Sequence, residues 1–256
     1  MSKTKLLLIS LGGAVLLLCL AVFAGKYFKQ DSRPRTVDEF MAERYVLLDE
    51  KKRIWGEKNA DGTADQDRSL RLDICASNHE QKDLNVFLLA VCGRAGENVT
   101  HIDSGTIDMY AINRSTGPFE VVAESHMDGF GSMGEPGEIK ILRLGRAFWG
   151  FQIEGGFTGQ GITVAHTRLY VPHKDDFTEA LNILSFYGNG GVTEDKDQQT
   201  EINREIVPLA NGTDNTYKLK ISETSRGKAS KVYMAGFDTA QWRYNYPKQL
   251  ADDPEL

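Results

Sequence analysis

The sequence predicts a mainly β fold: an antiparallel β-sandwich or barrel-like domain, preceded by one N-terminal transmembrane helix and a short juxtamembrane helix. The β domain is predicted by short runs after residue 70 that alternate apolar and polar residues, with Gly, Pro, Asn or Asp between runs. The membrane helix is predicted by residues 6–25, which carry no charge. We therefore divide the chain into an anchor or signal peptide (1–25), a connector with a helix (26–69) and a β-rich domain (70–256), with a possible split near 190–214.

The apolar segment reads LLLISLGGAVLLLCLAVFAG. Twenty helical residues span about 30 Å, the thickness of the hydrocarbon core of a bilayer. A cleaved signal peptide is the alternative, with a weak cleavage site at Val22-Phe23-Ala24. Because the apolar run is long for a signal peptide, we expect a retained anchor and name the membrane, through residues 6–25, as the first partner.

The orientation of this anchor is set by two opposing signals. Two lysines precede the segment and four basic residues follow it within 26–35, which by the positive-inside rule favours a cytoplasmic C-terminal domain. A very short basic N-terminus before a long globular domain is instead the layout of a signal-anchor protein of the bacterial cell envelope, and long domains translocate largely regardless of charge. We expect the C-terminal domain to be periplasmic or otherwise extracytoplasmic, with a cytoplasm-facing regulatory domain as the alternative.

The charge distribution argues against nucleic acid as a partner. Of the 30 basic and 36 acidic residues, six basic and one acidic lie within 1–35, so residues 36–256 carry 24 and 35, a net charge of −11. A domain this acidic repels phosphate backbones, and the sequence has no basic stripe with interleaved aromatic residues.

The secondary-structure elements follow in chain order. After the connector, Thr36-Val-Asp-Glu39 matches a capping box, which predicts a helix from Val37 to Leu48. Residues 56–69 read as a loop. The predicted strands cover 70–75, 85–92, 104–114, 119–127, 138–144, 147–154, 161–171, 216–223, 230–238 and 241–247.

Two stretches do not fit the strand pattern. In 175–186, Phe177, Ala180, Leu181 and Leu184 have the spacing of one helical face, so we predict a short helix there. Residues 188–214 are polar and contain an acidic run, which predicts a loop and suggests the possible division of the domain.

The two cysteines of the predicted β domain, Cys75 and Cys92, suggest a disulfide if the domain is exported. A simple hairpin of 70–75 with 85–92 would place Cys75 opposite about Asn85, roughly 20 Å from Cys92, whereas a disulfide needs Cα atoms within about 7 Å. A bridge therefore requires an irregular pairing. Two buried free thiols are the alternative.

Glycines at 129, 131 and 134 spell G-x-G-x-x-G within DGFGSMGEPG (128–137). In a dinucleotide site the last glycine leads into a helix that holds the pyrophosphate, but here Pro136 and a strand-like run follow. We interpret the segment as a hairpin loop between 119–127 and 138–144. We likewise interpret GGFTGQG (155–161) as a flexible connection, so no cofactor is predicted.

The candidate catalytic residues are Glu124, His126 and Asp128, which alternate along one predicted strand. Alternate strand residues point the same way about 7 Å apart, so these side chains could share a cation or act as an acid–base pair. The simpler interpretation is the solvent-facing side of a half-buried strand. On that view Phe119, Val121, Ala123 and Met127 form the buried side. None of the five histidines has a zinc-binding spacing.

These observations favour a binding or scaffolding domain held near the membrane, with no enzymatic activity. Aromatic residues of the strands that face outward could contact an envelope protein or polysaccharide. The alternative is an envelope hydrolase that uses Glu124, His126 and Asp128.

Overall fold

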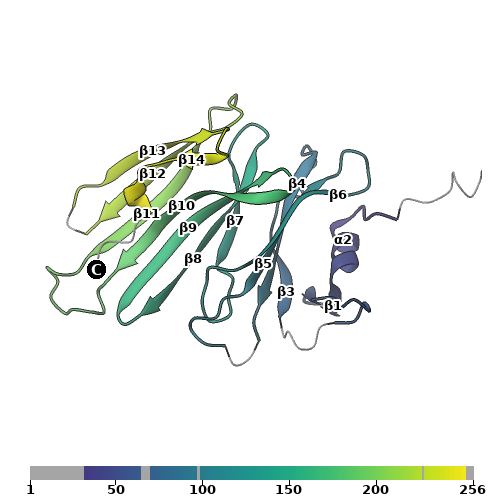
Figure 1. Cartoon of the computed structure of the whole chain (residues 1–256), viewed down its shortest axis with the longest axis horizontal. Helices are drawn as coiled ribbons and strands as arrows, with labels where there is room; N and C mark the ends of the chain where they lie inside the picture. The colour runs from purple at the N-terminus through teal and green to yellow at the C-terminus, as the bar shows by residue number, and fades with distance from the viewer. Residues whose placement is uncertain (1–31, 65–69, 97–98, 227, 252–256) are drawn as a thin grey trace, which may run out of the picture. The chain divides into compact units, whose positions relative to one another are not determined.

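The computed structural model describes residues 32–64, 70–96, 99–226 and 228–251. The chain divides into two compact units, 1–34 and 35–256, and every described helix and strand belongs to the second. This unit is built from two antiparallel sheets that follow one another along the chain, which confirms the predicted mainly β fold and fits a β-sandwich (Figure 1). The predicted membrane helix, residues 6–25, lies outside the described residues. Within them, no helix is long and apolar enough to cross a bilayer.

Helix α2 (Val37–Arg44) begins where the capping box predicts. The hydroxyl of Thr36 accepts a hydrogen bond from the amide of Glu39 at 3.2 Å. The carboxylate of Glu39 accepts one from the amide of Arg35 at 2.7 Å, one residue before the partner that a capping box uses. Two orphan amides at the helix start are therefore satisfied by side chains.

The helix ends four residues before the predicted end at Leu48. Tyr45 adopts an extended conformation, with φ −129° and ψ 166°, and β1 (Val46–Asp49) follows at once. β1 pairs with β2 (Ile54–Gly56), so residues 46–48, which we predicted to be helical, form part of the first hairpin of the sheet, and Gly56, where the predicted loop begins, ends its second strand. Long-range pairing has here overridden a helical pattern that had little apolar periodicity to support it.

The first sheet has six strands in the order of the chain. Its strands are β1, β2, β3 (Arg71–Ser77), β4 (Val86–Arg94), β5 (Thr106–Asn113) and β6 (Glu120–Asp128). Seven consecutive residues of β4 are buried, from Phe87 to Gly93. A strand reads as a continuous apolar run when both of its faces are covered, and that is the case here.

The second sheet has eight strands, again in chain order. Its strands are β7 (Glu138–Arg143), β8 (Trp149–Gly159), β9 (Ile162–His173), β10 (Asp176–Gly188), β11 (Glu201–Leu209), β12 (Lys218–Ser225), β13 (Lys231–Asp238) and β14 (Arg243–Asn245), after which a 3-10 turn (Lys248–Leu250) closes the described chain. β11 lies within the region predicted as a polar loop and joins β10 to β12, so one sheet continues through residues 201–209.

The predicted helix at 175–186 is wrong, because these residues form β10. Ala180 and Ser185 are extra residues in the pairing of β10 with β9, at two β-bulges. Each bulge shifts the alternation by one residue. The buried residues Phe177, Ala180, Leu181 and Leu184 are therefore three, one and three residues apart, as they would be on one face of a helix.

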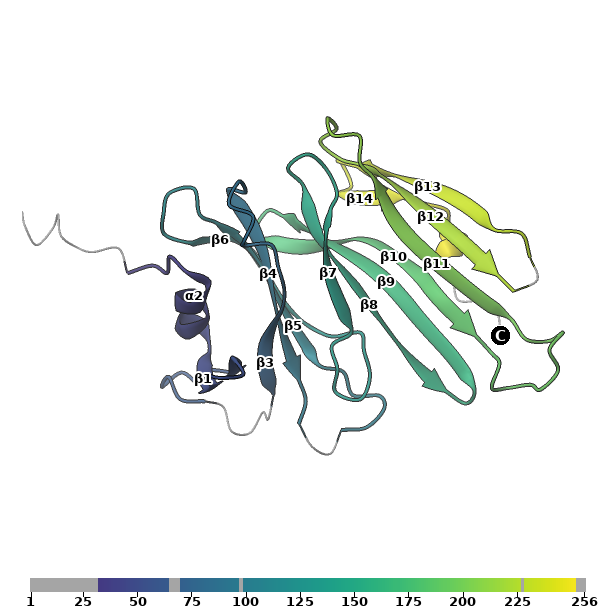
Figure 2. The same ribbon diagram turned by 180° about the vertical axis from the view of Figure 1, so that it is seen from behind.

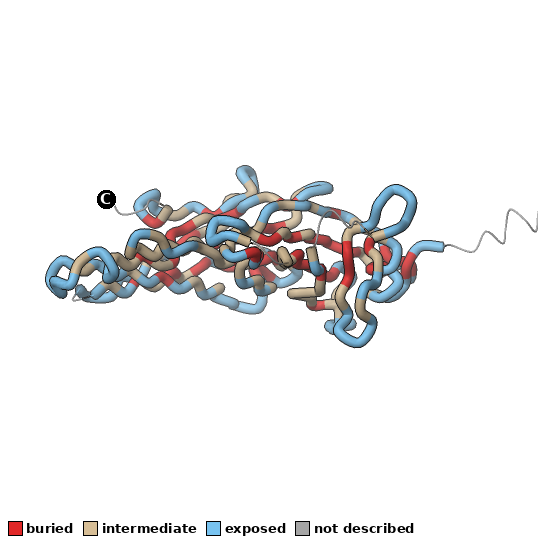
Figure 3. The backbone as a smooth tube through the Cα atoms, turned by 90° about the horizontal axis from the view of Figure 1, so that it is seen from below, coloured by how far each residue is buried: buried red, intermediate tan, exposed pale blue. Residues whose placement is uncertain are grey.

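Three clusters of buried side chains form the core. One lies between the two sheets and combines residues such as Met109 of β5 with Phe151 of β8. A second covers the other face of the first sheet, where Phe40 and Met41 of α2 pack with β4 and β5. The third belongs to β9–β14 (Figure 2). In Figure 3 the buried residues run along the strands, and the exposed ones gather in the connections.

The glycine-rich segment 129–137 is not the hairpin loop that we predicted, because β6 and β7 belong to different sheets (Figure 1). A Cβ atom on Gly131 would lie 2.3 Å from the carbonyl oxygen of Glu135, and one on Gly129 would lie 2.4 Å from the Cα of Pro136. Glycine is needed because the backbone passes close to itself as it changes sheets.

The second glycine-rich segment, 155–161, is also more regular than predicted. β8 runs to Gly159 and β9 starts at Ile162, so the connection is only Gln160-Gly161. Both residues have positive φ, +52° and +82°, the requirement of a tight two-residue hairpin turn.

Candidate functional site

Glu124, His126 and Asp128 lie on one face of β6, as the alternation predicts. They stand opposite Tyr110, Asp108 and Thr106 of β5, in that order. Helix α2 packs against this same face of the first sheet, over β4 and β5. The side chains of Glu124 and His126 are about half exposed, at 52% and 57%.

The buried side predicted for β6 is wrong in one respect. Phe119 and Val121 pack in the cluster under α2, whereas Ala123 and Met127 pack between the sheets. The cause is a β-bulge at Val122, where Ala111 pairs with Ala123 and the next residue of β5 pairs with Val121. One extra residue exchanges the two faces of a strand.

The three candidate residues are not joined to a common partner. Glu124 forms an ion pair with Arg44 of α2 at 2.8 Å. His126 Nδ1 contacts the carboxylate of Asp108, and that carboxylate is only 13% exposed. Within the residues that the structure describes, no three His, Cys, Asp or Glu side chains are placed to hold a metal ion.

Asp108 is also the centre of a buried hydroxyl network. Tyr45 donates its hydroxyl hydrogen to Asp108 at 2.5 Å and lies 2.6 Å from the hydroxyl of Tyr110. The guanidinium of Arg44 stacks over the Tyr110 ring at 4.8 Å. Burial is the main cause that raises the pKa of both hydroxyls, that of Tyr110 to about 12, and the negative charge of Asp108 adds to it.

This arrangement can orient a histidine, but it does not place a nucleophile beside it. Asp108 can hold one tautomer of His126, as a carboxylate does in an acid–base pair. Ser125, the hydroxyl residue between Glu124 and His126, lies on the opposite side of the strand and donates to Asp176 of β10. The network therefore ties the C-terminal end of α2 to β5 and β6.

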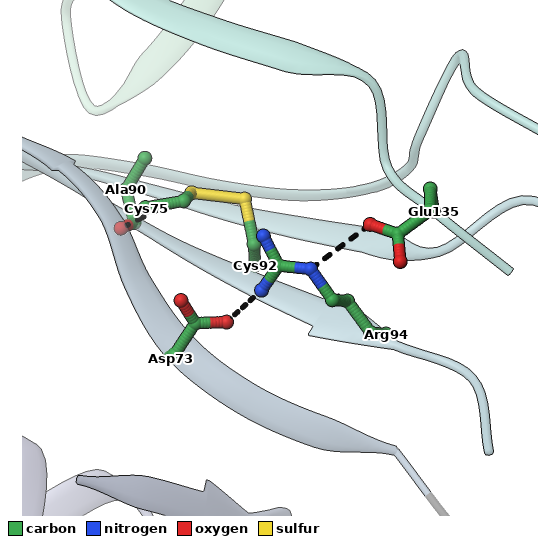
Figure 4. Close-up of polar contacts among 6 residues, drawn as sticks. All are labelled: Asp73, Cys75, Ala90, Cys92, Arg94 and Glu135. Atoms are coloured by element: carbon green, nitrogen blue, oxygen red, sulfur yellow. Dashed lines mark hydrogen bonds and ion pairs between the residues drawn. A yellow bond between two sulfur atoms is a disulfide. The ribbon is translucent and has the colours of Figure 1, made fainter. Parts of the chain in front are cut away.

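Cys75 and Cys92 form a disulfide with their Cα atoms 5.7 Å apart (Figure 4). The register that we predicted for the two strands is wrong: Asp73 pairs with Cys92 and Ile74 with Val91, while Cys75 is the extra residue of a β-bulge. The strands are thus irregular neighbours, which is the condition that the bridge requires.

The observed register differs from the predicted one because residues 78–85 form an irregular connection and do not extend the two strands. The backbone amide of Asn78 donates a hydrogen bond to the carbonyl oxygen of Leu88 at 3.2 Å. In return, the backbone amide of Leu88 donates one to the side-chain oxygen of Asn78 at 2.7 Å. Asn85 therefore belongs to the connection and does not face Cys75. No local pattern in the sequence signals this irregular connection.

Arg94 lies beside the disulfide and joins three elements. Its guanidinium bonds the carboxylate of Asp73 on β3 and, at 2.9 Å, that of Glu135 in the segment between the sheets (Figure 4). All three side chains are 38–59% exposed, so solvent screens these pairs and their contribution to stability is small.

A cavity of about 870 Å³ lies between the start of α2, the turn between β1 and β2, and the connections that precede β4 and follow β5. Its charged lining consists of Arg35, Asp38, Arg53, Lys82 and Arg114. Four cations and one carboxylate thus meet on a domain that is strongly acidic overall. Sequence reasoning missed this site because its residues come from five separate stretches with no shared spacing.

Arg114 organises one wall of this cavity. It donates hydrogen bonds to the carbonyl oxygens of His79 at 2.6 Å, Leu84 at 2.9 Å and Gln81. The guanidinium also lies over the ring of Phe87 at 5.3 Å. These partners are neutral, so they fix the position of the charge without cancelling it.

No family model, no curated protein and no solved structure matches the chain.

Proposed function

We propose that this protein is a single-pass, membrane-anchored protein of the bacterial envelope, whose β-rich domain binds or scaffolds a partner and has no catalytic role. The observation that carries the proposal is the pairing of the candidate residues. Glu124 is engaged by Arg44 and His126 by Asp108, so the polar face of β6 serves to attach α2 to the sheet. A convergent catalytic group would leave these side chains directed at a common point.

Two further features support the location. Residues 6–25 are long and apolar enough to be an anchor. The bond between Cys75 and Cys92 is of a kind that persists in oxidising compartments such as the periplasm. The first feature supports attachment to the membrane, and the disulfide supports an exported C-terminal domain independently of the charges that flank the apolar segment.

The test is the topology of the full chain in a bacterial host. Alkaline phosphatase and, separately, a fluorescent protein are fused after Leu256, with Cys75 and Cys92 assayed by alkylation before and after reduction. We expect active phosphatase, a dark fluorescent protein and two thiols that react only after reduction. A bright fluorescent fusion with freely reacting thiols would instead establish a cytoplasm-facing domain.

The second candidate, a hydrolase, is favoured by one observation, the contact between Asp108 and His126. Its test is a panel of esterase, glycosidase and peptidase substrates. The folded protein is compared with Glu124→Ala, His126→Ala and Asp128→Ala. We expect no turnover above that of buffer. Turnover that disappears in His126→Ala and persists in a variant of another exposed histidine, His101→Ala, would overturn the binding proposal.

A further inference from the structure

The cavity beside α2 differs from the rest of the domain in its charge. Residues 36–256 carry a net charge of −11, yet the lining of this cavity holds four cations against one carboxylate. That carboxylate, Asp38, is already paired with Arg53. In the described part of the chain no carboxylate pairs with Arg35, Lys82 or Arg114, so three positive charges remain without a counter-charge.

The cavity is also partly apolar. Val37, Ile74, Leu84 and Phe119 share its lining with the cations. A volume of about 870 Å³, with apolar walls and a few placed polar groups, is within the range that is typical of small-molecule binding. Clustered positive charge over apolar surface suits a ligand with an anionic head and an apolar or neutral remainder.

The number of uncompensated charges selects the anion. A single carboxylate would neutralise one of the three cations and leave two without a counter-charge. A phosphate monoester carries a charge of about −1.5 to −2 at neutral pH and has three acceptor oxygens. Arginine forms paired hydrogen bonds with phosphate, and lysine supplies a mobile point charge.

We propose that this cavity is a binding site for a phosphate ester, with Arg35 and Lys82 as its adjustable cations and Arg114 as its fixed one. The same phosphate monoester chemistry is offered by the headgroup of a lipid such as phosphatidic acid and by a soluble organic phosphate. The inference gives a ligand class to the binding domain of the proposed function, but its test does not depend on which side of the membrane the domain occupies.

The experiment uses the full chain in a neutral detergent and measures binding by calorimetry. The probes are glycerol 3-phosphate, a short-chain phosphatidic acid and glycerol as the uncharged control. The variant Arg35→Gln/Lys82→Gln removes two exposed cations whose side chains hold no other part of the fold. The matched control, Lys51→Gln/Arg146→Gln, removes one exposed lysine and one exposed arginine outside the cavity, so both variants have the same net charge.

We expect the phosphate probes to bind, glycerol not to bind, and the cavity variant to bind at least about tenfold more weakly, the loss expected for one to two charge-assisted hydrogen bonds. The control variant should bind as the wild type does. Equal affinity for the two phosphates identifies a soluble ester as the ligand, and binding of phosphatidic acid alone identifies a lipid headgroup. Absence of phosphate binding, or equal weakening in both double variants, would overturn the assignment. Either result would leave the topology test unaffected.

Discussion

Arg204 and Glu223 face each other across β11 and β12, and their side chains are only 6% and 7% exposed. Arg204 Nε bonds the Glu223 carboxylate at 2.9 Å, and its Nη1 bonds the carbonyls of Leu184 and Leu250. One buried cation therefore connects β10, β11, β12 and the turn that follows β14. Such a group stabilises the fold only while all of its partners remain in place.

Removal of this cation should be costly. In Arg204→Met the buried carboxylate keeps, among the residues that the structure describes, only Lys231 as a cationic partner, at 3.3 Å. We expect the free energy of unfolding to fall by about 3 kcal/mol, the lower end of the range for breaking a buried pair. Chemical denaturation measures the change. The double variant Arg204→Met/Glu223→Leu should recover part of the lost free energy of unfolding. A double variant less stable than Arg204→Met would contradict this account.

The same pair gives the protein an acid-sensitive component of stability. Burial alone raises the pKa of Glu223, but the hydrogen bond and charge of Arg204, together with those of Lys231, outweigh it and hold the pKa below its ordinary value of 4.5. Because the folded pKa is the lower one, the stabilisation is complete above pH 4.5 and is lost as the pH falls through the folded pKa.

The hydroxyl network of Tyr45 and Tyr110 gives the protein a second component of stability, which is lost at alkaline pH instead of acidic pH. Burial first, and then the charge of Asp108, raises both pKa values above the usual 10, to about 12 for Tyr110. The neutral hydroxyl is the form that the fold stabilises. This contribution is complete below pH 10 and is lost as the pH rises toward 12.

We expect Tyr110→Phe to flatten the decline of stability between about pH 10 and 12, measured by denaturant unfolding at a series of pH values. Absorbance of tyrosinate should show fewer residues that resist ionisation at about pH 11 in the variant than in the wild type. Tyr246→Phe, which follows β14 and packs against the second sheet, is the control. An unchanged pH profile in Tyr110→Phe would refute the role of the network.

At the scale of elements, β3 and β4 are joined in two ways, by the hydrogen bonds of their antiparallel pairing and by the disulfide. The bridge spans 17 residues of sequence. A loop of that length, when closed in the unfolded chain, contributes about 3 kcal/mol through the entropy that the unfolded state loses. Its contribution is large relative to the roughly 5–15 kcal/mol that is typical of a folded domain.

The double variant Cys75→Ser/Cys92→Ser should therefore lose about 3 kcal/mol of unfolding free energy relative to the oxidised wild type. Reduction of the wild type should cause a loss of similar size. Cys19→Ser, outside the β domain, is the matched control and should be neutral. Equal stability of the oxidised and reduced protein would show that the bridge does not constrain the unfolded chain.

How far the sequence predicts the elements depends on how local their signals are. Ten strands were predicted near their observed positions, because alternation of apolar and polar residues is visible within a few residues, whereas β1, β2, β10 and β11 were missed. Three β-bulges defeat the same reasoning: those at Ala180 and Ser185 make β10 resemble a helix, and that at Val122 exchanges the faces of β6. A bulge is fixed by the partner strand, so one strand read by itself does not reveal it.

The candidate site was predictable in part for the same reason. The shared face of Glu124, His126 and Asp128 follows from their spacing alone, whereas their partners on α2 and β5 do not. The cavity beside α2 depends on stretches at 35–38, 53, 74, 79–85 and 114–119 that meet only in the folded chain. The sheet to which β7 belongs was missed as well, since a glycine-rich loop looks the same whether it turns back or crosses over.

At the scale of the whole domain, the two sheets are covered unequally. β4 and β5 lie between the second sheet on one face and α2 on the other, so apolar clusters bury them on both sides. β13 has only the three-residue β14 beyond it, and its Val232 and Met234 are 58% and 48% exposed. Local opening is easiest where few apolar contacts must break.

Hydrogen exchange followed by mass spectrometry should resolve this difference. We expect the amides of β4 (Val86–Arg94) to exchange slowest in the domain, at the rate of global unfolding, and those of β13 (Lys231–Asp238) to exchange faster through local opening. Peptides from the turns provide the fast reference. Exchange of β13 as slow as that of β4 would show that the domain opens only as a single unit.

The order of the strands has a consequence for how the chain acquires its fold. In both sheets every strand pairs with the one that precedes it in the chain. A polypeptide that emerges N-terminus first, from a ribosome or a translocation channel, can therefore add each strand to an edge that is already present. No connection between successive partners is longer than the 14 residues between β2 and β3. The entropic cost of each addition grows only slowly with the length of the connection, and the first sheet can close over α2 while the second is still being delivered.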